Sequence, residues 1–411
     1  MKDYLKVVTL KLQNNSMQLL TLEKSSLRQK KAILTAQEIA GQPGLWESIY
    51  EAFDNAASGI RDFLQAAYAE SDNIILTGAG TSAFIGLSLE GPFSRNTQII
   101  TRAVATTNIV SHPHDYFTTT HTSLVISFAR SGNSPESCAA LNLADKFSGK
   151  CFHLIITCDK DGALAHYDSS NPTYVFILPE AANDKSLAMT GSYTGMLLTG
   201  LMTAYIHQEQ KIKEQVTLVT MAAKNLLSNG AEMIRKIAEK DFKRAVFLGS
   251  GNLFGTATEA ALKLQELTDG IIVSKEDTYL GLRHGPKAVI DESTLVVCFF
   301  SNNNYVKKYE EDMVSTMKSG NNVMFQFGVS ENFKAINGLD AQINFGVDSK
   351  NIEEDFLPVC AILAGQLLGF YKSLQLGLAP DNPSVYGSIS RVVKGVNIYP
   401  AEIPTPVMNY K

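Results

Sequence analysis

Short runs of consecutive apolar residues alternate with longer segments of mixed polarity along most of the chain. The first run, Asn73–Thr77, is rich in β-branched residues and has no polar alternation, which is typical of a strand buried on both faces. Three further runs in the same half, at 123–128, 152–157 and 174–178, are spaced widely enough for helices between them. Strands that alternate with helices predict a parallel α/β sheet with right-handed crossovers.

The same pattern recurs in the second half of the chain. Gly78 and Gly249 each follow an apolar run and each open a Gly-x-Gly turn before a predicted helix, so we expect a tandem repeat of one α/β domain. The repeat is unequal, because nothing in the second half corresponds to the polar loop Arg130–Ser134. We therefore expect the first half to carry most of the binding loop. The strands predicted in the second half are 245–248, 294–300, 322–327 and 341–345, and the helix after Gly249 is expected to end at Leu267.

Breaks in these patterns predict the domain plan. Helical spacing dominates the first 70 residues, and Gly41–Gly44 interrupts it. The last 35 residues hold five of the thirteen prolines and are expected to lie as irregular chain over the body. The predicted parts are, in chain order, an N-terminal helical segment (1–47), a first α/β domain (48–210), a linker helix (211–240), a second α/β domain (241–376) and a carboxy-terminal tail (377–411).

Composition narrows the classes of protein to which the chain can belong. With 45% hydrophobic residues and a net charge of −5 over 411 residues, the chain can bury two cores and offers no basic surface for nucleic acid. Five cysteines without Cys-x-x-Cys spacing indicate neither a disulfide framework nor a thiolate metal site. The first thirty residues lack a signal-peptide core, and no uncharged apolar run reaches the roughly 18 residues of a membrane span. We expect a cytoplasmic protein that binds neither membranes nor nucleic acid.

Hydroxyl side chains stand where two of the predicted strands end. Thr81 and Ser82 follow the first strand, and Ser131 and Ser134 follow the second. Ligands of parallel sheets bind beyond the carboxyl ends of the strands, where helix N-termini present free N–H groups, and hydroxyls beside them suit a phosphate. The alternative is that these side chains only cap helices, with Ser134 at the N-cap and Pro135 at the first helical position. A dinucleotide site is rejected, because the spacing of the glycines and the missing acidic residue do not fit that fingerprint.

Three charged residues share one face of the long helix predicted in the second half. Glu259, Lys263 and Glu266 lie within about 60° of one another at 3.6 residues per turn. The helix is otherwise apolar, so the charged stripe is either a solvated face or the lining of a site. His284 precedes Gly-Pro on a constrained turn that can hold an imidazole for proton transfer, and Lys394 is an isolated base in an apolar stretch. Each of these two residues can equally be structural.

Taken together, these motifs resemble the sugar isomerase (SIS) domain family. GAGTS at 78–82, ARSGNSPES at 129–137, EAALKLQE at 259–266, RHGP at 283–286 and the tail around Lys394 have the order and spacing of the isomerase half of glucosamine-6-phosphate synthase, a tandem pair of SIS domains. TAQEIAGQPGLW at 35–46 and TDGIIVSKEDTYLGLRHGP at 268–286 are closer to the galactosamine-6-phosphate deaminase/isomerase family, long labelled tagatose-6-phosphate ketose/aldose isomerases. The resemblance extends over nearly the whole chain from about residue 35. It implies an α/β fold of tandem SIS domains, each a flavodoxin-like three-layer sandwich with a parallel sheet between helices.

The chain departs from the synthase in two ways. The glutaminase domain with its N-terminal cysteine is not found, since residue 2 is Lys2 and the first cysteine is Cys138, so we expect no ammonia release from glutamine by that route. Where the synthase has a Ser-Gln-Ser loop, this chain has Ala129-Arg130-Ser131, so one hydroxyl is lost and a cation is gained.

The resemblance implies a role for each matching residue. Glu266 would carry a proton between C1 and C2 of the sugar, and Lys394 would meet the open-chain carbonyl. His284 would open the ring by reaching into the neighbouring subunit's site. The residues implied in substrate binding are Thr81, Ser82, Arg130, Ser131, Ser134, Glu259 and Lys263.

We therefore predict a deaminating isomerase that converts D-galactosamine 6-phosphate into D-tagatose 6-phosphate and ammonia. Proton transfer between C1 and C2 of a 2-amino sugar yields a ketose imine that water hydrolyses, so we expect no metal and no cofactor. The implied assembly is a homodimer or a higher homo-oligomer with shared active sites, acting on a phosphorylated hexosamine or ketohexose. Three alternatives stay open: a plain ketose/aldose phosphate isomerase, a deglycase for a phosphorylated sugar amine, and a non-catalytic regulator that binds sugar phosphates.

Overall fold

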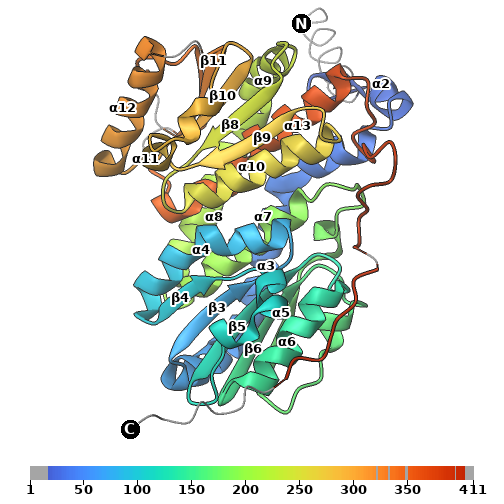
Figure 1. The fold of residues 1–411 in the computed structure, drawn as a ribbon, viewed down its shortest axis with the longest axis vertical. Helices are drawn as coiled ribbons and strands as arrows, with labels where there is room; N and C mark the ends of the chain where they lie inside the picture. Colours follow the sequence, from blue (N-terminus) through green and yellow to red (C-terminus); the bar gives the residue numbers. More distant parts are fainter. Residues whose placement is uncertain (1–16, 321–322, 332–333, 348–349, 394, 403–411) are drawn as a thin grey trace, which may run out of the picture.

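The chain folds into two lobes, each built around a five-stranded parallel sheet, with a layer of helices between them (Figure 1). A computed structural model describes residues 17–320, 323–331, 334–347, 350–393 and 395–402. The strand orders are β4-β3-β5-β6-β7 and β12-β11-β10-β8-β9. Because both sheets follow the same flavodoxin-like order, the expected tandem repeat of one α/β domain is confirmed.

The first lobe and the segments on either side of it contain helices, strands and a few short 3₁₀ turns. In chain order they are β1 (Gln18–Leu19), β2 (Leu22–Glu23), α2 (Lys24–Gln29), α3 (Ile33–Glu70), β3 (Asn73–Thr77), α4 (Thr81–Thr97), β4 (Ile100–Ala103), α5 (Thr106–Ser111), β5 (Thr122–Ala129), α6 (Pro135–Phe147), β6 (Lys150–Thr157), β7 (Thr173–Ile177) and α7 (Gly191–Ala204). Two helices, α8 (Glu209–Asn225) and α9 (Ala231–Ala238), cover the region where the sequence predicts one linker helix.

The second lobe repeats this plan with fewer helices. Its elements are β8 (Arg244–Leu248), α10 (Leu253–Leu267), β9 (Val273–Asp277), α11 (Tyr279–Leu282), β10 (Thr294–Phe299), α12 (Asn304–Gly320), β11 (Phe325–Ser330), β12 (Ala341–Asn344) and α13 (Leu357–Gln375). The strand predicted at 322–327 therefore begins and ends three residues later than expected, and α10 ends at Leu267 as predicted.

The structure adds one strand to each half that the apolar pattern did not predict. β4 pairs with β3, and β9 pairs with β8, so both are edge strands at the same place in the repeat. Arg102 in β4 and Lys275 in β9 interrupt any apolar run, and most residues of these strands are partly exposed. An edge strand is covered less completely than a central one, so its side chains need not be apolar.

Helix α3 runs without a break through the glycines and the proline that predict an interruption at 41–44. Pro43 has no N–H for the carbonyl of Ile39, and the Gln42 side-chain amide donates to that carbonyl at 3.2 Å instead. Gln42 also bonds to Gln366 of α13 at 2.6 Å, which ties this turn into the core. The predicted break is wrong because tertiary contacts replace the hydrogen bond that proline removes.

Helix α10 lies between the lobes, packed against α4 of the first lobe and α13 of the second (Figure 1). A Cβ atom at Gly255 would lie 2.2 Å from Ser88 Oγ of α4, so the close approach needs glycine. Ser88 Oγ donates to the carbonyl of Asn252 at 2.7 Å, at the start of α10. Gly365 has the same function in α13, where a Cβ would lie 2.5 Å from Ala260 Cβ. This packing brings side chains of α10 to the N-terminus of α4.

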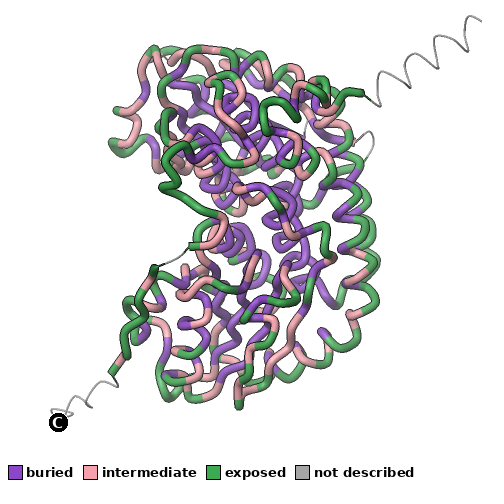
Figure 2. Tube along the Cα trace, turned by 90° about the vertical axis from the view of Figure 1, so that its right-hand side faces the viewer, coloured by how far each residue is buried: buried purple, intermediate pink, exposed green. Residues whose placement is uncertain are grey.

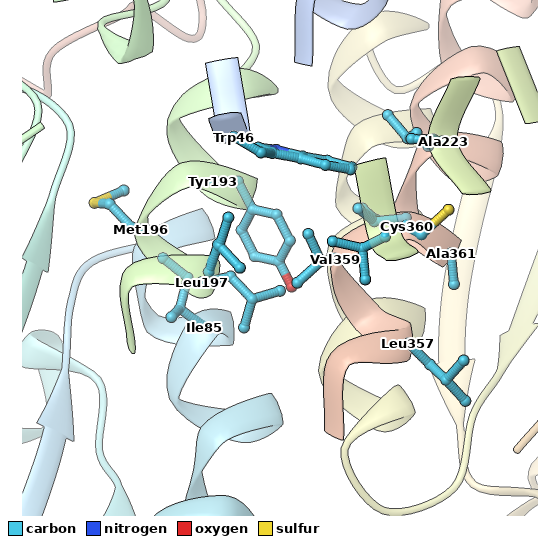
Figure 3. Packing of buried hydrophobic residues seen from close by; sticks show 14 of the residues in the cluster. Trp46, Ile85, Tyr193, Met196, Leu197, Ala223, Leu357, Val359, Cys360 and Ala361 are labelled. Carbon is cyan, nitrogen blue, oxygen red and sulfur yellow. The ribbon is translucent and has the colours of Figure 1, made fainter. Parts of the chain in front are cut away.

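The apolar core is continuous through the layer of helices between the two lobes. Figure 3 shows Trp46 of α3 and Tyr193 of α7 close to Val359 and Cys360 of α13. The indole N–H of Trp46 donates to Thr194 Oγ1 at 3.0 Å, so its polar group is satisfied inside the core.

One helical stretch among the described residues, Glu354–Gln375, is long and apolar enough to cross a membrane. In this fold it is a core helix, because 94% of its apolar window is buried against the rest of the protein. Figure 2 shows this distribution along the chain, with buried residues inside both lobes and in the layer between them.

The carboxy-terminal segment crosses from the second lobe to the first, and its described residues, 377–393 and 395–402, form neither helix nor strand (Figure 1). The carboxylate of Asp381 accepts the N–H groups of Leu34 and Thr35, in the first turn of α3. Farther along, the carbonyl of Glu402 lies 3.1 Å from the imidazole Nε2 of His114. The segment therefore lies along the side of the molecule, as the proline-rich sequence predicts.

Candidate active site

The carboxyl ends of β3 and β5 meet the carboxy-terminal segment at a cavity of about 140 Å³. Its lining comes from the turn around Gly80, the loop around Ser131, Met189 and residues 391–393. Helices α4 and α6 both begin at this cavity, so the positive ends of two helix dipoles lie beside it. This is the edge at which parallel α/β sheets bind their ligands.

Hydroxyl groups line the cavity on two sides. Ser82 comes from the first turn of α4, and Ser131, Ser134 and Ser137 come from the loop after β5 and the start of α6. Ser134 is at the N-cap of α6, as predicted, but its hydroxyl donates to Ser137 Oγ at 2.5 Å instead of capping the helix. Gly132 has a φ of +64°, a conformation that lets the loop turn back into the helix. Hydroxyls and helix N-termini together suit a compact anion such as a phosphate.

Arg130 lines the same cavity, but its guanidinium is turned toward backbone carbonyls. Nη1 donates to the carbonyl of Leu187 at 3.0 Å, and Nη2 donates to the carbonyl of Arg391 at 2.6 Å. The side chain is buried, and this burial lowers the pKa of Arg130, while the carboxylates of Asp184 and Glu266 favour its charged form. The guanidinium of Arg130, which the sequence predicts to bind the substrate, therefore also binds backbone carbonyls of the protein.

Arg391 is a cavity residue that the sequence analysis did not select. Arg391 stands three residues before Lys394, so the choice of Lys394 as a candidate site residue could have drawn attention to it. The Nε group of Arg391 donates to the carbonyl of Asp184 at 2.9 Å, and its Nη2 group donates to the side chain of Asn183. Nothing in the composition of residues 183–189 distinguishes them as part of a site.

The charged face of α10 is buried and meets the first lobe. Lys263 is fully buried, and its ammonium lies 3.4 Å from Glu259 Oε1 and forms a hydrogen-bonded ion pair with Glu266. The same ammonium donates to Thr81 Oγ1 of α4 at 3.1 Å. A solvated stripe is therefore wrong for this face, and Thr81 faces the cluster rather than the cavity that its neighbour Ser82 lines.

The two carboxyl groups beside Lys263 differ in their surroundings. Glu259 is fully buried, and neither of its carboxyl oxygens has a hydrogen-bond partner among the described residues. Burial raises the pKa of Glu259 to about 8, against the opposing charge of Lys263. Glu266 keeps 24% of its side chain exposed and bonds directly to the ammonium. One buried cation between two carboxyls favours a single negative charge, so we assign the proton to Glu259 and the carboxylate to Glu266.

The described part of the chain does not bring His284 into the cavity. His284 is exposed in the turn after α11, ahead of Gly285 with its φ of +119°, and it does not line the cavity. Lys394 lies outside the described residues, although its predecessors Val392 and Val393 line the cavity.

The corresponding edge of the second sheet is filled by carboxyl groups of the protein itself. Ser301, which follows β10, donates its backbone N–H to Glu310 Oε2 at 3.0 Å, and its hydroxyl donates to Glu354. Burial raises the pKa of Glu310 to about 7. Because Glu310 already accepts from this amide, the amide is not free for an anionic ligand. That the first half carries most of the binding loop stays a prediction.

One buried cluster contains residue types that bind metals. Asp145, Cys151 and His153 place ligand atoms within 4.8 Å of one another. The Asp145 carboxylate accepts from four side chains, namely His153 Nε2 (2.6 Å), Tyr167 Oη (2.6 Å), Ser169 Oγ (2.8 Å) and Asn171 Nδ2 (2.9 Å). Its lone pairs are thereby used, so the cluster is a hydrogen-bond hub that joins α6 and β6 to the loop before β7.

Several known proteins are similar to this chain in sequence and in fold. The SIS domain family matches residues 67–206. The D-galactosamine-6-phosphate deaminase AgaS of Shewanella sp. (strain ANA-3) is 38% identical over 387 residues, which are 93% of this chain and 95% of the relative. A solved structure from Clostridium novyi NT is 39% identical and has a TM-score of 0.90, covering 93% of this chain and 99% of that one. The tagatose-6-phosphate ketose/aldose isomerase from Escherichia coli is 33% identical, with a TM-score of 0.81, and covers 90% of this chain and 97% of its own. The chain therefore belongs to the AgaS family of SIS-domain proteins.

Proposed function

We propose that this protein converts D-galactosamine 6-phosphate into D-tagatose 6-phosphate and ammonia. The observation that carries the proposal is the buried Glu259–Lys263–Glu266 cluster, which contacts α4 beside a cavity lined by hydroxyls and helix N-termini. A full-length relative that shares 38% of its residues is named for this deamination. The cavity supplies an anion site, and the cluster supplies a carboxylate that can move a proton.

In this proposal the hydroxyls of Ser82, Ser131 and Ser134 hold the phosphate. Glu266 then takes the proton from C2 of the open-chain aldehyde while O1 gains a proton, which gives an enolamine. The proton held by Glu266 returns to C1 while the amine nitrogen gives one up, which yields a 2-imino sugar. Water adds to C2 of the imine and ammonia leaves, which completes the ketose. Glu259 and Lys263 stabilise the negative charge on Glu266, and Thr81 orients the ammonium of Lys263.

His284 opens the sugar ring and Lys394 meets the free carbonyl in this proposal. Because His284 is exposed and does not line the cavity of its own chain, we propose that it acts in the site of a neighbouring subunit of a homodimer or higher homo-oligomer. We also place the protein in the cytoplasm, in keeping with five free thiols.

A plain ketose/aldose isomerase is the second candidate, because the E. coli neighbour carries that name and the same proton transfer interconverts aldose and ketose phosphates. Ammonia release from galactosamine 6-phosphate, with glucosamine 6-phosphate and tagatose 6-phosphate assayed beside it, separates the two. Release from the galacto sugar supports deamination. Aldose formation from tagatose 6-phosphate without ammonia release from either amino sugar would replace the proposal with the isomerase.

Glu266→Gln tests the proton carrier. Turnover should fall by about a hundredfold or more, while sugar-phosphate affinity stays within about tenfold, because the amide keeps the shape but cannot carry the proton. Glu70→Gln, at an exposed ion pair with Lys150, is the matched control and should leave turnover unchanged. Full activity of Glu266→Gln would sink the assignment of this residue.

Mixed oligomers test the shared site. Glu266→Gln and His284→Ala subunits are each expected to be inactive as pure proteins. A mixture of the two should recover activity, because one site in each mixed dimer then has both intact residues. No recovery in verified mixed oligomers would place His284 outside the neighbouring site.

A further inference from the structure

Two arginines tie the carboxy-terminal segment to the binding loop. Arg130, in the loop after β5, donates to the backbone carbonyl of Arg391 at 2.6 Å. Arg391 in turn reaches back to the first lobe, where it donates to the carbonyl of Asp184 at 2.9 Å and to the side chain of Asn183. The second branch of Arg130 donates to the carbonyl of Leu187 at 3.0 Å. Both guanidinium groups thus bond to one short loop, residues 183–187. Arg130 precedes this loop in the sequence, and Arg391 follows it.

That loop is itself rigidly held. The Asp184 carboxylate is buried and accepts the N–H groups of Thr190, Gly191 and Ser192, at distances of 2.7 to 3.1 Å. It thereby caps the N-terminus of α7. Glu38 of α3 accepts the N–H groups of the next two residues after Asp184, at 2.6 and 3.1 Å. A loop fixed to two core helices can serve as an anchor for chain that has no secondary structure of its own.

The anchored chain forms part of the cavity wall. Val392 and Val393 line the cavity together with Ser82 and Ser134. Among the described residues, the backbone N–H groups of 391–393 donate no hydrogen bond to the first lobe. The carbonyl and the side chain of Arg391 are therefore the points of attachment of this stretch. The next residue in the chain is Lys394.

We propose that Arg130 and Arg391 form a clasp that seats residues 391–393, which directly precede Lys394 in the sequence, against the cavity. The inference rests on the proposed function for its catalytic consequence, but not for the contacts themselves. In this role both arginines are positioning residues. The guanidinium of Arg130 donates hydrogen bonds to three carbonyls, those of Ser186, Leu187 and Arg391, so not all of its N–H groups are free to bind a phosphate.

The clasp makes a prediction that a phosphate-binding role does not. Replacing Arg391 with Gln should speed amide hydrogen exchange in the peptide that spans 385–389 of the ligand-free protein by about tenfold or more. The N–H groups of Val385 and Ile389 are hydrogen-bonded there, to Asp269 and to Ser384 Oγ, and they open more often once the segment loses the charge-assisted bonds of Arg391. Turnover of galactosamine 6-phosphate should fall by about tenfold or more, while KM and inhibition by inorganic phosphate stay within about threefold. Arg391→Lys, which keeps the charge and one donor, should recover part of both effects.

The controls separate a clasp from a ligand and from misfolding. Arg28→Gln, at an exposed position of α2, should change neither exchange nor turnover. Arg130→Gln should increase exchange in the same peptide; since Arg130 is buried, the partly exposed Arg391 provides the variant that tests the idea if this one fails to fold. Unchanged exchange in Arg391→Gln overturns the clasp. So does a rise in KM and in the phosphate inhibition constant with turnover number and exchange unchanged, since that result makes the arginines phosphate ligands. If the wild-type protein releases no ammonia, the proposed function fails, and the exchange measurement still decides whether the clasp exists.

Discussion

Glu259 offers a direct test of how charge is distributed in the buried cluster. The side chain is fully buried beside Lys263, and burial raises the pKa of Glu259 from its usual 4.5 to about 8. The folded protein therefore binds this proton more tightly than the unfolded chain does. The contribution of the group to stability is complete below pH 4.5 and is lost as the pH rises toward 8. At about 1.4 kcal/mol per pH unit, the loss amounts to about 5 kcal/mol.

Glu259→Gln copies the protonated form and removes this titration. The free energy of unfolding, measured by urea denaturation with circular dichroism between pH 5 and pH 8, should fall less steeply with pH in the variant than in the wild type. Near pH 8 the variant should be more stable than the wild type by up to about 5 kcal/mol, and near pH 5 the two should be nearly equal. Glu47→Gln, at an exposed pair with Lys224, should leave the pH profile unchanged.

The opposite result would refute the assignment of the proton. If Glu259 is ionised and paired with Lys263 across their 3.4 Å separation, removing its charge leaves a buried ammonium with one partner fewer. Glu259→Gln would then destabilise the protein by about 3–5 kcal/mol at neutral pH. If Glu259→Gln is less stable than the wild type by the same free energy of unfolding at every pH, Glu259 is a carboxylate in the folded protein.

Three further perturbations test the packing that builds the site. Lys263→Met should lower the free energy of unfolding by about 3–5 kcal/mol, because it leaves buried carboxyl groups without their cation. Lys224→Met, at the surface, should cost less than about 1 kcal/mol. Similar costs for the two variants in urea denaturation would contradict the buried cluster. Gly255→Ala should cost about 1–3 kcal/mol and reduce turnover, because the new Cβ would lie 2.9 Å from backbone atoms of α4; unchanged melting and activity would count against the close contact. Asp184→Ala should cost about 3 kcal/mol, because it removes the cap of α7 and leaves buried N–H groups without partners, and a melting temperature equal to that of the wild type would rule out the cap.

The central strands of both halves could be predicted from local pattern alone. Asn73–Thr77 is a strand with the predicted bounds, and the strand predicted at 123–128 lies within β5. Such strands are covered on both faces, so burial leaves an unbroken apolar run in the sequence. The edge strands β4 and β9 could not be found in this way, because polar residues such as Arg102 and Lys275 interrupt any apolar run and only pairing with β3 and β8 makes these segments strands.

Part of the candidate site was also readable from residue type and spacing. The hydroxyls of Ser82, Ser131 and Ser134 line one cavity, and Glu259, Lys263 and Glu266 share one helix face, because helix geometry and the ends of parallel strands are local consequences of the sequence. Arg391 escaped notice, since its contacts are to carbonyls of a loop about 200 residues away.

By itself, the sequence determined the repeated α/β plan and the residue types available for phosphate binding and proton transfer, because periodicity and turn chemistry act over a few residues. Only the tertiary structure decided which lone pairs and N–H groups are already engaged in hydrogen bonds within the protein. Thr81 turns to Lys263 instead of the cavity, Arg130 turns to backbone carbonyls, and Gln42 repairs the hydrogen bond that Pro43 removes. Each of these outcomes depends on groups far apart in the chain that become neighbours only when burial makes an unpaired polar atom costly.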